Sequence, residues 1–242
     1  MHRLLVETAQ LSQDAPSLSG DAVRHLRVIR PEAEERIELF DGKGRWRVYA
    51  WNGGLRAAGE LRESERPPAR IVLFACVTKG SRWDWTIAKA TELGVARIVP
   101  VISDRTIVRI PKGERAAKRE RWMRVAEDAA RQSDAKWLPE IDEAVDFEDS
   151  IPLVRGTACF VGALTDPPPR PLLSAMAGVE PLPTRPVAVY VGPEGDFTPA
   201  ELSALLECAT PASFGPTILR AETAAIFAVS VAAAVSARAN MV

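Results

Sequence analysis

Residues 186–201 read PVAVYVGPEGDFTPAE, and this stretch predicts the class of the fold. Residues 186–191 form a continuous apolar run, which is typical of a strand buried on both faces of a parallel sheet. Gly192-Pro193-Glu194-Gly195 follows at once as a short loop. Thr198-Pro199-Ala200-Glu201 then combines an N-cap residue, a proline at the first helical position and a capping box, so we expect a helix to begin there. A buried strand, a glycine-bearing loop and a capped helix together indicate an α/β domain.

The same alternation of strands and helices extends over residues 68–242. Ser81 is expected to begin a helix, with Asp84 completing its capping box. The apolar pair Ile218-Leu219 is expected to form a short strand. The remaining predicted elements are buried strands over 71–77, 97–102 and 157–164, a long basic helix over 114–133, and an alanine-rich helix from residue 222. These elements predict a mostly parallel sheet covered by helices.

The first 67 residues have a different pattern. Short alternating apolar segments are separated by Asp41-Gly42 and Asn52-Gly53-Gly54, which are turn sequences. A helix over 21–30 interrupts the strands. The spacing predicts a small β-barrel over residues 1–67 that is joined through Pro67-Pro68 to the α/β domain over 68–242.

Composition limits the possible functions. The chain has 242 residues, with 31 basic and 32 acidic side chains and a net charge of -1, which argues against a strongly basic nucleic-acid coat protein. Cys76, Cys159 and Cys208 are too few and too far apart for a disulfide framework or a zinc site, and we expect buried free thiols and no metal. The apolar stretch over 224–235 is too short to cross a bilayer. We therefore expect a soluble, cytoplasmic protein.

The loop Gly192-Pro193-Glu194-Gly195 is the first candidate site. It follows a buried strand, and ligands of α/β sheets bind outside the carboxyl ends of the strands. Glycines at both ends allow the backbone to approach a ligand closely. The alternative is a tight connection without a ligand. The chain contains no G-x-G-x-x-G and no P-loop sequence, so a standard dinucleotide or nucleoside triphosphate site lacks support.

The segment Ile218-Leu219-Arg220-Ala221-Glu222-Thr223-Ala224 is the second candidate site. Arg220 and Glu222 precede the alanine-rich helix. They could form an ion pair at the helix start, where the macrodipole favours Glu222. Alternatively, the guanidinium and the carboxylate orient a polar substrate at the mouth of the same crevice.

Basic side chains are concentrated in one run that contains only two acids, Glu114 and Glu120. A solvated helix face is the ordinary interpretation, and a binding surface for phosphates is the alternative. The run comprises Arg105, Arg109, Lys112, Arg115, Lys118, Arg119, Arg121 and Arg124, and the N-terminal part adds Arg3, Arg24, Arg27 and Arg30.

Several motifs together make the chain resemble a known family. They are His2-Arg3, His25 to Arg30, Leu39 to Gly42, Lys79, Ala90 to Val95, Arg105, Gln132-Ser133, Pro139, Gly192 to Gly195 and Ile218 to Thr223. In this order and spacing they resemble the RsmE family of small-subunit ribosomal RNA N3-uridine methyltransferases, in the SPOUT superfamily. The resemblance implies a PUA-like RNA-binding barrel followed by a trefoil-knotted α/β methyltransferase domain. It also implies S-adenosylmethionine as cofactor, the 16S ribosomal RNA of the small subunit as substrate, and a homodimer.

The resemblance also implies roles for individual residues. The cofactor loops would comprise Val161, Gly162, Val191, Gly192, Pro193, Glu194, Gly195, Phe214, Gly215, Ile218, Leu219 and Arg220. RNA contacts would come from Arg3, Arg27, Arg30, Lys79, Arg105, Arg115, Lys118 and Arg119. Arg220 would stabilise negative charge on the uracil carbonyls, and Glu222 would accept the N3 proton or orient Arg220.

This chain departs from the family pattern at three places. Asp196 stands where the family has a second glycine after Gly195, and Asp tolerates unusual backbone angles better than most residues. Ala135 stands where the family commonly has arginine. The stretch from His25 to Arg30 is one residue shorter than in the family.

Two other functions are compatible with these features. A related SPOUT enzyme that acts on another RNA would share the cofactor loops. A non-catalytic RNA-binding or ribosome assembly protein would need the barrel and the basic helix only.

Overall fold

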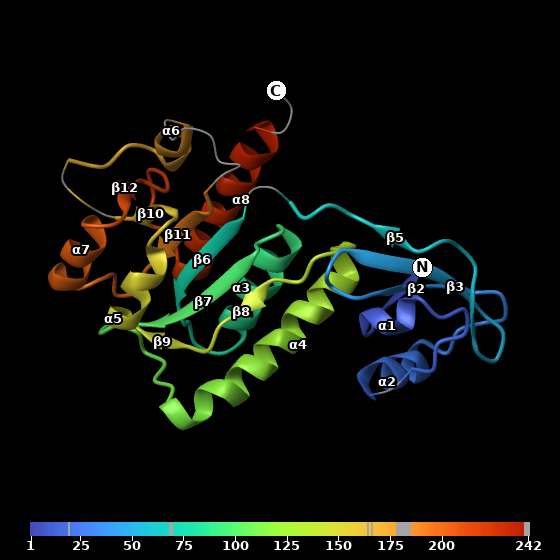
Figure 1. The fold of residues 1–242 in the computed structure, drawn as a ribbon. Helices are drawn as coiled ribbons and strands as arrows, with labels where there is room; N and C mark the ends of the chain where they lie inside the picture. The colour runs from blue at the N-terminus through green and yellow to red at the C-terminus, as the bar shows by residue number, and fades with distance from the viewer. Residues whose placement is uncertain (19, 68–69, 164, 166, 178–184, 240–242) are drawn as a thin grey trace. The chain divides into compact units, whose positions relative to one another are not determined.

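The computed structural model describes residues 1–18, 20–67, 70–163, 165, 167–177 and 185–239 (Figure 1). These residues form two compact units. Unit 1 comprises Met1–Arg66 and Glu127–Leu138, and unit 2 comprises Pro67–Ala126 and Pro139–Val242. The expected domain boundary lies between Pro67 and Pro68, and Pro68 is outside the described residues. Leu164, the expected last residue of a strand, is also outside them.

Unit 2 contains a parallel sheet of seven strands in the order β12-β10-β11-β6-β7-β8, with β9 also paired to β7 (Figure 1). Every pairing in this sheet is parallel, as the sequence predicts. The strands are β6 (Ile71–Cys76), β7 (Arg97–Ile102), β8 (Glu140–Ile141), β9 (Val145–Asp146), β10 (Ala158–Gly162), β11 (Val187–Val191) and β12 (Thr210–Ala212). The helices are α3 (Ser81–Glu92), η1 (Lys112–Glu114), α4 (Arg115–Ser133), α5 (Phe147–Ser150), η2 (Ile151–Val154), α6 (Leu172–Ala177), α7 (Pro199–Leu206) and α8 (Ala221–Ala239). Residues 127–133 of α4 belong to unit 1.

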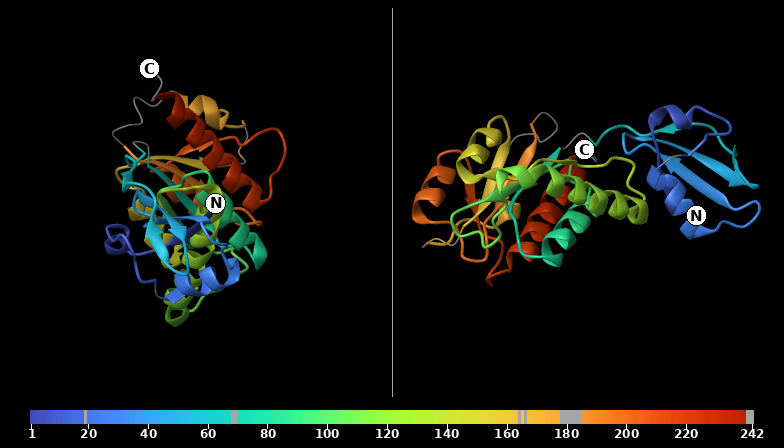
Figure 2. Two further views of the ribbon diagram at one scale, coloured as in Figure 1. Left: turned by 90° about the vertical axis from the view of Figure 1, so that its right-hand side faces the viewer. Right: turned by 90° about the horizontal axis from the view of Figure 1, so that it is seen from below.

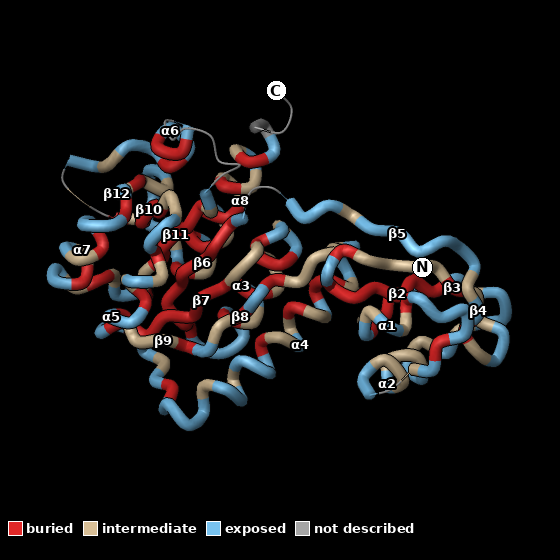
Figure 3. Tube along the Cα trace, in the orientation of Figure 1, coloured by how far each residue is buried: buried red, intermediate tan, exposed pale blue. Residues whose placement is uncertain are grey.

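Both faces of this sheet are covered, which explains why its strands are continuous apolar runs. Leu73 and Val189 point to one face, where they pack with residues of α3, α6 and α8. Phe74 and Tyr190 point to the other face, where their rings stack 5.3 Å apart and pack with residues of α5, η2 and α7. Figure 2 shows the ribbon of the sheet and its helices from two further directions. All six residues of β6 are consequently buried (Figure 3).

Three local predictions in unit 2 are wrong. The helix α3 begins at Ser81 as predicted, but the expected capping box is absent, because Gly80 is the N-cap and Asp84 pairs with Arg121. Ile218 is 84% exposed and belongs to no strand, while the unpredicted β12 lies upstream at 210–212. Cys208 is exposed because it follows the last turn of α7, whereas Cys76 and Cys159 are buried as expected.

Unit 1 is built on a five-stranded sheet in the order β1-β2-β3-β4, with β5 also paired to β3. Its elements are β1 (His2–Leu5), α1 (Thr8–Leu11), α2 (Gly20–Ile29), β2 (Arg36–Phe40), β3 (Arg45–Trp51), β4 (Leu55–Ala57) and β5 (Arg62–Glu63). Tyr49 is fully buried because its ring packs with the apolar cluster of this unit, and its hydroxyl donates to the carbonyl oxygens of Leu11 and Gln13 at 3.1 and 3.0 Å.

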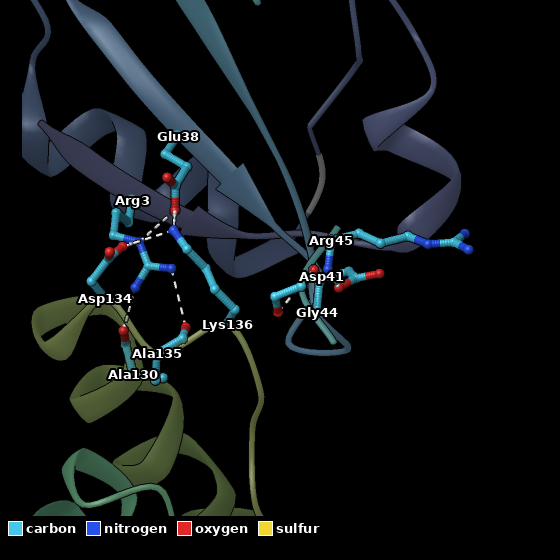
Figure 4. A network of polar contacts seen from close by, with 10 residues as sticks. Arg3, Glu38, Asp41, Gly44, Arg45, Ala130, Asp134, Ala135 and Lys136 are labelled. Carbon is cyan, nitrogen blue, oxygen red and sulfur yellow. Dashed lines mark hydrogen bonds and ion pairs between the residues drawn. The ribbon is translucent and has the colours of Figure 1, made fainter. Parts of the chain in front are cut away.

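A buried ionic network fixes residues 127–138 within unit 1 (Figure 4). The Arg3 side chain is 6% exposed, and its Nε donates to Oε1 of Glu38 at 2.7 Å. Its two terminal nitrogens donate to the carbonyl oxygens of Ala130 and Ala135. Lys136 Nζ lies 2.7 Å from the same oxygen of Glu38. Arg3 therefore satisfies carbonyl groups at the C-terminal end of α4, a position where helices leave acceptors unpaired.

Replacing Arg3 with methionine should lower the free energy of unfolding by about 3–5 kcal/mol, because the buried carboxylate of Glu38 loses one of its two cations. Urea unfolding followed by near-ultraviolet circular dichroism would measure the change. Arg24→Ala is the matched control, since Arg24 pairs with Asp21 on the surface and should cost less than about 1 kcal/mol. Equal losses for the two variants would contradict a structural role for the Arg3 network.

Candidate active site

A pocket lies at the carboxyl ends of three adjacent strands of unit 2 (β10, β11 and β12). Because parallel strands place their carboxyl ends at the same edge, the loops that follow them converge. The start of α8 completes the wall. The pocket is lined by Gly162, Ala163, Val191, Gly192, Pro193, Glu194, Asp196, Ser213, Phe214, Gly215, Thr217, Ile218, Leu219, Ala221 and Ala224.

The loop after β11 is anchored in the core at its far end. Phe197 is buried, and its ring lies 5.6 Å from that of Tyr190. A Cβ at Gly192 would come within 3.0 Å of the Phe197 ring, so this position favours glycine. The Thr198 hydroxyl accepts from the Glu201 amide at 3.2 Å, and a Glu201 carboxylate oxygen accepts from the Thr198 amide at 2.8 Å. The predicted capping box at the start of α7 is confirmed.

The loop conformation explains the aspartate at position 196. Asp196 has a φ of 60°, in the left-handed region that glycine adopts most easily. Its own amide donates to the carbonyl oxygen of Pro193 at 3.0 Å, and its carboxylate accepts from the Phe197 amide at 2.8 Å. Asp can adopt this conformation because its short side chain forms a local hydrogen bond. The substitution therefore keeps the backbone path that a glycine would permit.

Gly162 at the end of β10 allows an aromatic ring to approach the strand. A Cβ at this position would lie 2.6 Å from the Phe214 ring, which is closer than carbon atoms can pack. Phe214 also contacts Phe227 of α8, with ring centroids 5.8 Å apart. Gly162 and Phe214 thus shape one wall of the pocket together.

Arg220 and Glu222 flank Ala221, which lines the pocket. Arg220 is exposed, and its carbonyl oxygen accepts from the Ala224 amide at 2.8 Å in the first turn of α8. Among the described residues, no ion pair or hydrogen bond joins the side chains of Arg220 and Glu222. Oε2 of Glu222 is buried and has no hydrogen-bond partner in the described part of the protein. A buried carboxylate oxygen without a partner is unfavourable, and this atom lies on a residue next to Ala221, whereas Glu222 and Arg220 themselves are not among the residues that line the pocket.

The pocket brings together most of the residues that the sequence analysis places in the cofactor loops. It contains Gly162, Val191, Gly192, Pro193, Glu194, Phe214, Gly215, Ile218 and Leu219. Val161 instead packs with the apolar cluster on the α7 side of the sheet. Gly195 lies against the side chain of Arg105. The pocket also contains Ala221 and Ala224, which belong to the second candidate segment, and Asp196, which directly follows the first candidate loop. Ala163, Ser213 and Thr217 were not predicted, and only their adjacency to motif residues could have indicated them.

Several of the expected RNA-contacting side chains bind other parts of the protein. Arg105 and Arg119 donate to main-chain carbonyl oxygens, and Arg115 pairs with Asp146 at 2.5 Å. Arg3 is buried in the ionic network described above, so its guanidinium is not accessible to a phosphate. The others retain exposed or half-buried positions: Arg27, Arg30, Lys79 and Lys118.

Other kinds of chemistry receive no support from the described residues. Burial raises the pKa of the Cys76 thiol to about 12, so this thiol remains protonated at neutral pH and is a poor nucleophile. No group of three or more potential metal ligands gathers in the described ranges. Within the same ranges, none of the helices has the length and apolar character needed to cross a membrane.

Comparisons with known proteins agree with this geometry. The family of RNA methyltransferase domains matches residues 65–233. The chain is 31% identical over 247 residues to ribosomal RNA small subunit methyltransferase E of Mycobacterium bovis, covering 91% of this chain and 87% of that protein. It is 28% identical over 253 residues to the protein of the same name from Bacillus subtilis, covering 95% of each.

Two solved structures with bound cofactor are also similar. Ribosomal RNA small subunit methyltransferase E from Neisseria gonorrhoeae, bound to S-adenosyl methionine, has a TM-score of 0.75 at 26% identity, covering 95% of each chain. A protein from Legionella pneumophila in complex with the bound cofactor SAM has a TM-score of 0.76 at 28% identity, covering 96% of each chain. The matched family domain, the related sequences and the shared fold agree: this chain belongs to the ribosomal RNA small subunit methyltransferase E family of RNA methyltransferases.

Proposed function

We propose that this protein transfers a methyl group from S-adenosylmethionine to N3 of a uridine in the 16S ribosomal RNA of the small subunit. Family membership supports the general reaction. The observation that carries the chemistry is Glu222, which has a buried, unpartnered carboxylate oxygen and is the neighbour of a pocket-lining residue. A base of this kind is what N3 of uridine requires, because N3 carries a proton and is a poor nucleophile until that proton is removed.

The pocket has the chemical character that S-adenosylmethionine needs. Main-chain groups of three loops line it, and Val191, Phe214 and Leu219 add apolar walls of the kind that accept an adenine ring. The acidic residues Glu194 and Asp196 also line it, and their negative charge complements a cationic ligand, although the Glu194 carboxylate is paired with Arg82 and the Asp196 carboxylate accepts from the Phe197 amide. The sulfonium of the bound cofactor supplies an activated methyl group, so the protein has to position the reactants and remove one proton.

Arg220 and Glu222 perform these tasks in the proposed mechanism. Glu222 accepts the N3 proton, directly or through water. This role is favoured over that of orienting Arg220, because no ion pair joins the two side chains among the described residues. Arg220 is exposed and places its guanidinium where it stabilises the negative charge that develops on the uracil carbonyl oxygens. Since N3 lies on the Watson–Crick edge, the uridine enters the site unpaired.

Unit 1 supplies RNA binding in this proposal. We assign it the PUA-like barrel fold of the family. Arg27 in the last turn of α2 and Arg30 directly after that helix are the proposed contacts to RNA phosphates. Lys79 and Lys118 are the corresponding candidates in unit 2. The same resemblance leads us to propose that unit 2 contains a trefoil knot, that the protein works as a homodimer, and that it acts in the cytoplasm, where ribosomes are assembled.

Methylation of purified small ribosomal subunits with labelled S-adenosylmethionine, followed by mapping of the modified nucleotide, tests the reaction. Wild-type protein should label N3 of one uridine in 16S ribosomal RNA. Glu222→Gln should lower kcat by about 10²–10⁴-fold, because a neutral amide cannot accept the proton. Its affinity for the cofactor should not change.

Glu207→Gln is the matched control, since Glu207 is an exposed carboxylate at the end of α7 and should leave turnover intact. Near-normal turnover by Glu222→Gln would refute the role of Glu222 as the base. Labelling of transfer RNA, or of another atom, would replace the proposed substrate with that of a related enzyme. Cofactor binding without labelling of any RNA would favour a non-catalytic protein.

Gly162→Ala should weaken cofactor binding on the order of tenfold, because the added Cβ pushes the Phe214 ring toward the pocket. Isothermal titration with S-adenosylmethionine would measure the dissociation constant. Gly113→Ala is the control, since a Cβ there has no heavy atom within 4 Å. If both variants bind equally well, the wall formed by Gly162 and Phe214 does not shape the cofactor site.

Replacement of Arg27 and Arg30 by alanine should weaken RNA binding. The slope of the logarithm of affinity against the logarithm of salt concentration should become shallower by about 0.7–0.9 for each phosphate contact that is lost. Filter binding to 16S ribosomal RNA over a salt series would measure both quantities. Arg24→Ala provides the comparison, because Arg24 is already paired with Asp21. An unchanged slope would place the RNA contacts elsewhere.

A further inference from the structure

The loop over 192–198 carries three residues with unusual conformational freedom or strain. Gly192 and Gly195 lack a side chain, and Asp196 has a positive φ. Such a loop loses more backbone entropy on ordering than an ordinary one. Its internal hydrogen bonds are few and local, from the amide of Asp196 to the carbonyl of Pro193 and from the amide of Phe197 to the carboxylate of Asp196. The conformation of the loop therefore depends on groups outside it.

Several such groups contact the loop: Glu201 accepts from the Thr198 amide, and Arg82 pairs with Glu194. Arg105, in the segment that follows β7, is the one that contacts the main chain on both sides of Asp196. Its Nη1 donates to the carbonyl oxygen of Gly195 at 2.8 Å and to that of Phe197 at 3.3 Å. These two carbonyls flank Asp196, so one guanidinium nitrogen spans the strained residue. The aliphatic part of the same side chain lies against the loop, with Cβ and Cδ of Arg105 at 3.4 and 3.5 Å from the position of a Cβ on Gly195.

The segment that carries Arg105 is itself held firmly. Oε1 of the buried Glu201 accepts from the amide of Asp104 at 2.8 Å, while Oε2 accepts from the amide of Thr198 at 2.8 Å. One carboxylate thus joins the loops that follow β7 and β11. Arg109 donates to the carbonyl oxygens of Ser103 and Asp104 and closes the segment. The main chain next to Arg105 is therefore held in place by these hydrogen bonds, and the Arg105 side chain extends from it to the loop.

We propose that Arg105 is a positioning residue that sets the conformation of the cofactor loop, and that it does not act primarily as an RNA contact. By holding the carbonyls of Gly195 and Phe197, it keeps the pocket-lining side of the loop in its binding conformation before the cofactor arrives. Preorganisation of this kind increases affinity because less entropy is lost on binding. This inference rests on the proposed function, since it assigns the pocket to S-adenosylmethionine.

The experiment compares wild-type protein with Arg105→Ala, Arg105→Lys and Arg155→Ala. Arg155 is the control, since it is an exposed arginine beside the amino end of β10, at the edge of the same sheet away from the pocket. Titration calorimetry without RNA measures the affinity for S-adenosylmethionine. Filter binding without cofactor measures the affinity for 16S ribosomal RNA. Hydrogen exchange in the free protein measures protection of the amides of Asp196 and Phe197.

Arg105→Ala should weaken cofactor binding by about tenfold, raise KM for the cofactor, and leave KM for RNA and RNA affinity unchanged, because only the loop loses its support. The two amides should exchange faster in this variant. Arg105→Lys should recover part of the cofactor affinity, because an ammonium can still donate to a carbonyl oxygen. Arg155→Ala should resemble the wild type in all three measurements.

The inference would be overturned by an Arg105→Ala protein with unchanged cofactor affinity and reduced RNA affinity, since Arg105 would then be an RNA contact. Equal exchange rates in wild type and Arg105→Ala would overturn it as well. A wild-type protein that binds no S-adenosylmethionine is a different failure, because it removes the proposed function itself. Should Arg105→Ala fold poorly, Arg105→Lys provides the test. Its cofactor affinity should lie below that of the wild type and its RNA affinity should be unchanged, and the reverse pattern would overturn the inference.

Discussion

The direction of the strands in unit 2 is the constraint on which the candidate site depends. All pairings in the seven-stranded sheet are parallel, so, apart from the short link between β8 and β9, which both pair with β7, each connection leaves one edge of the sheet and returns to the other. Helices supply these connections, and they bury both faces of the sheet. The carboxyl ends of β10, β11 and β12 then meet at one edge, together with the start of α8. Three segments that are distant in sequence, 162–163, 191–196 and 213–224, therefore form one pocket.

A pocket made of loops needs side chains that hold the loops in place. Buried Phe197 fastens the loop after β11 to the core, and Glu201 fastens it to the neighbouring loop after β7. Asp196 resolves its own strained backbone with a local hydrogen bond. The architecture brings the loops together, and a small number of polar contacts determines their shape.

Arginine has a structural role in this protein that net charge does not reveal. Arg3, Arg105 and Arg119 all donate to main-chain carbonyl oxygens, a task suited to a planar group with several donors. Arg3 does so in a buried network that includes Glu38 and Lys136 and incorporates residues 127–138 into unit 1. A cluster of basic residues in the sequence is therefore a weak guide to the surface available to RNA.

The sequence by itself determined the elements whose information is local. The apolar runs of β6, β7 and β11 predict buried parallel strands, the capping box predicts the start of α7, and the motifs around Gly192 and Ile218 indicate the pocket and the family. Only the tertiary structure decided which groups complete the site. Strands of two or three residues such as β8, β9 and β12 are too short to produce a periodic pattern. Arg3 is buried and Arg105 contacts the loop because segments far apart in the chain come together, and such contacts exist only after the chain has folded. The same is true of the burial that leaves Oε2 of Glu222 without a hydrogen-bond partner.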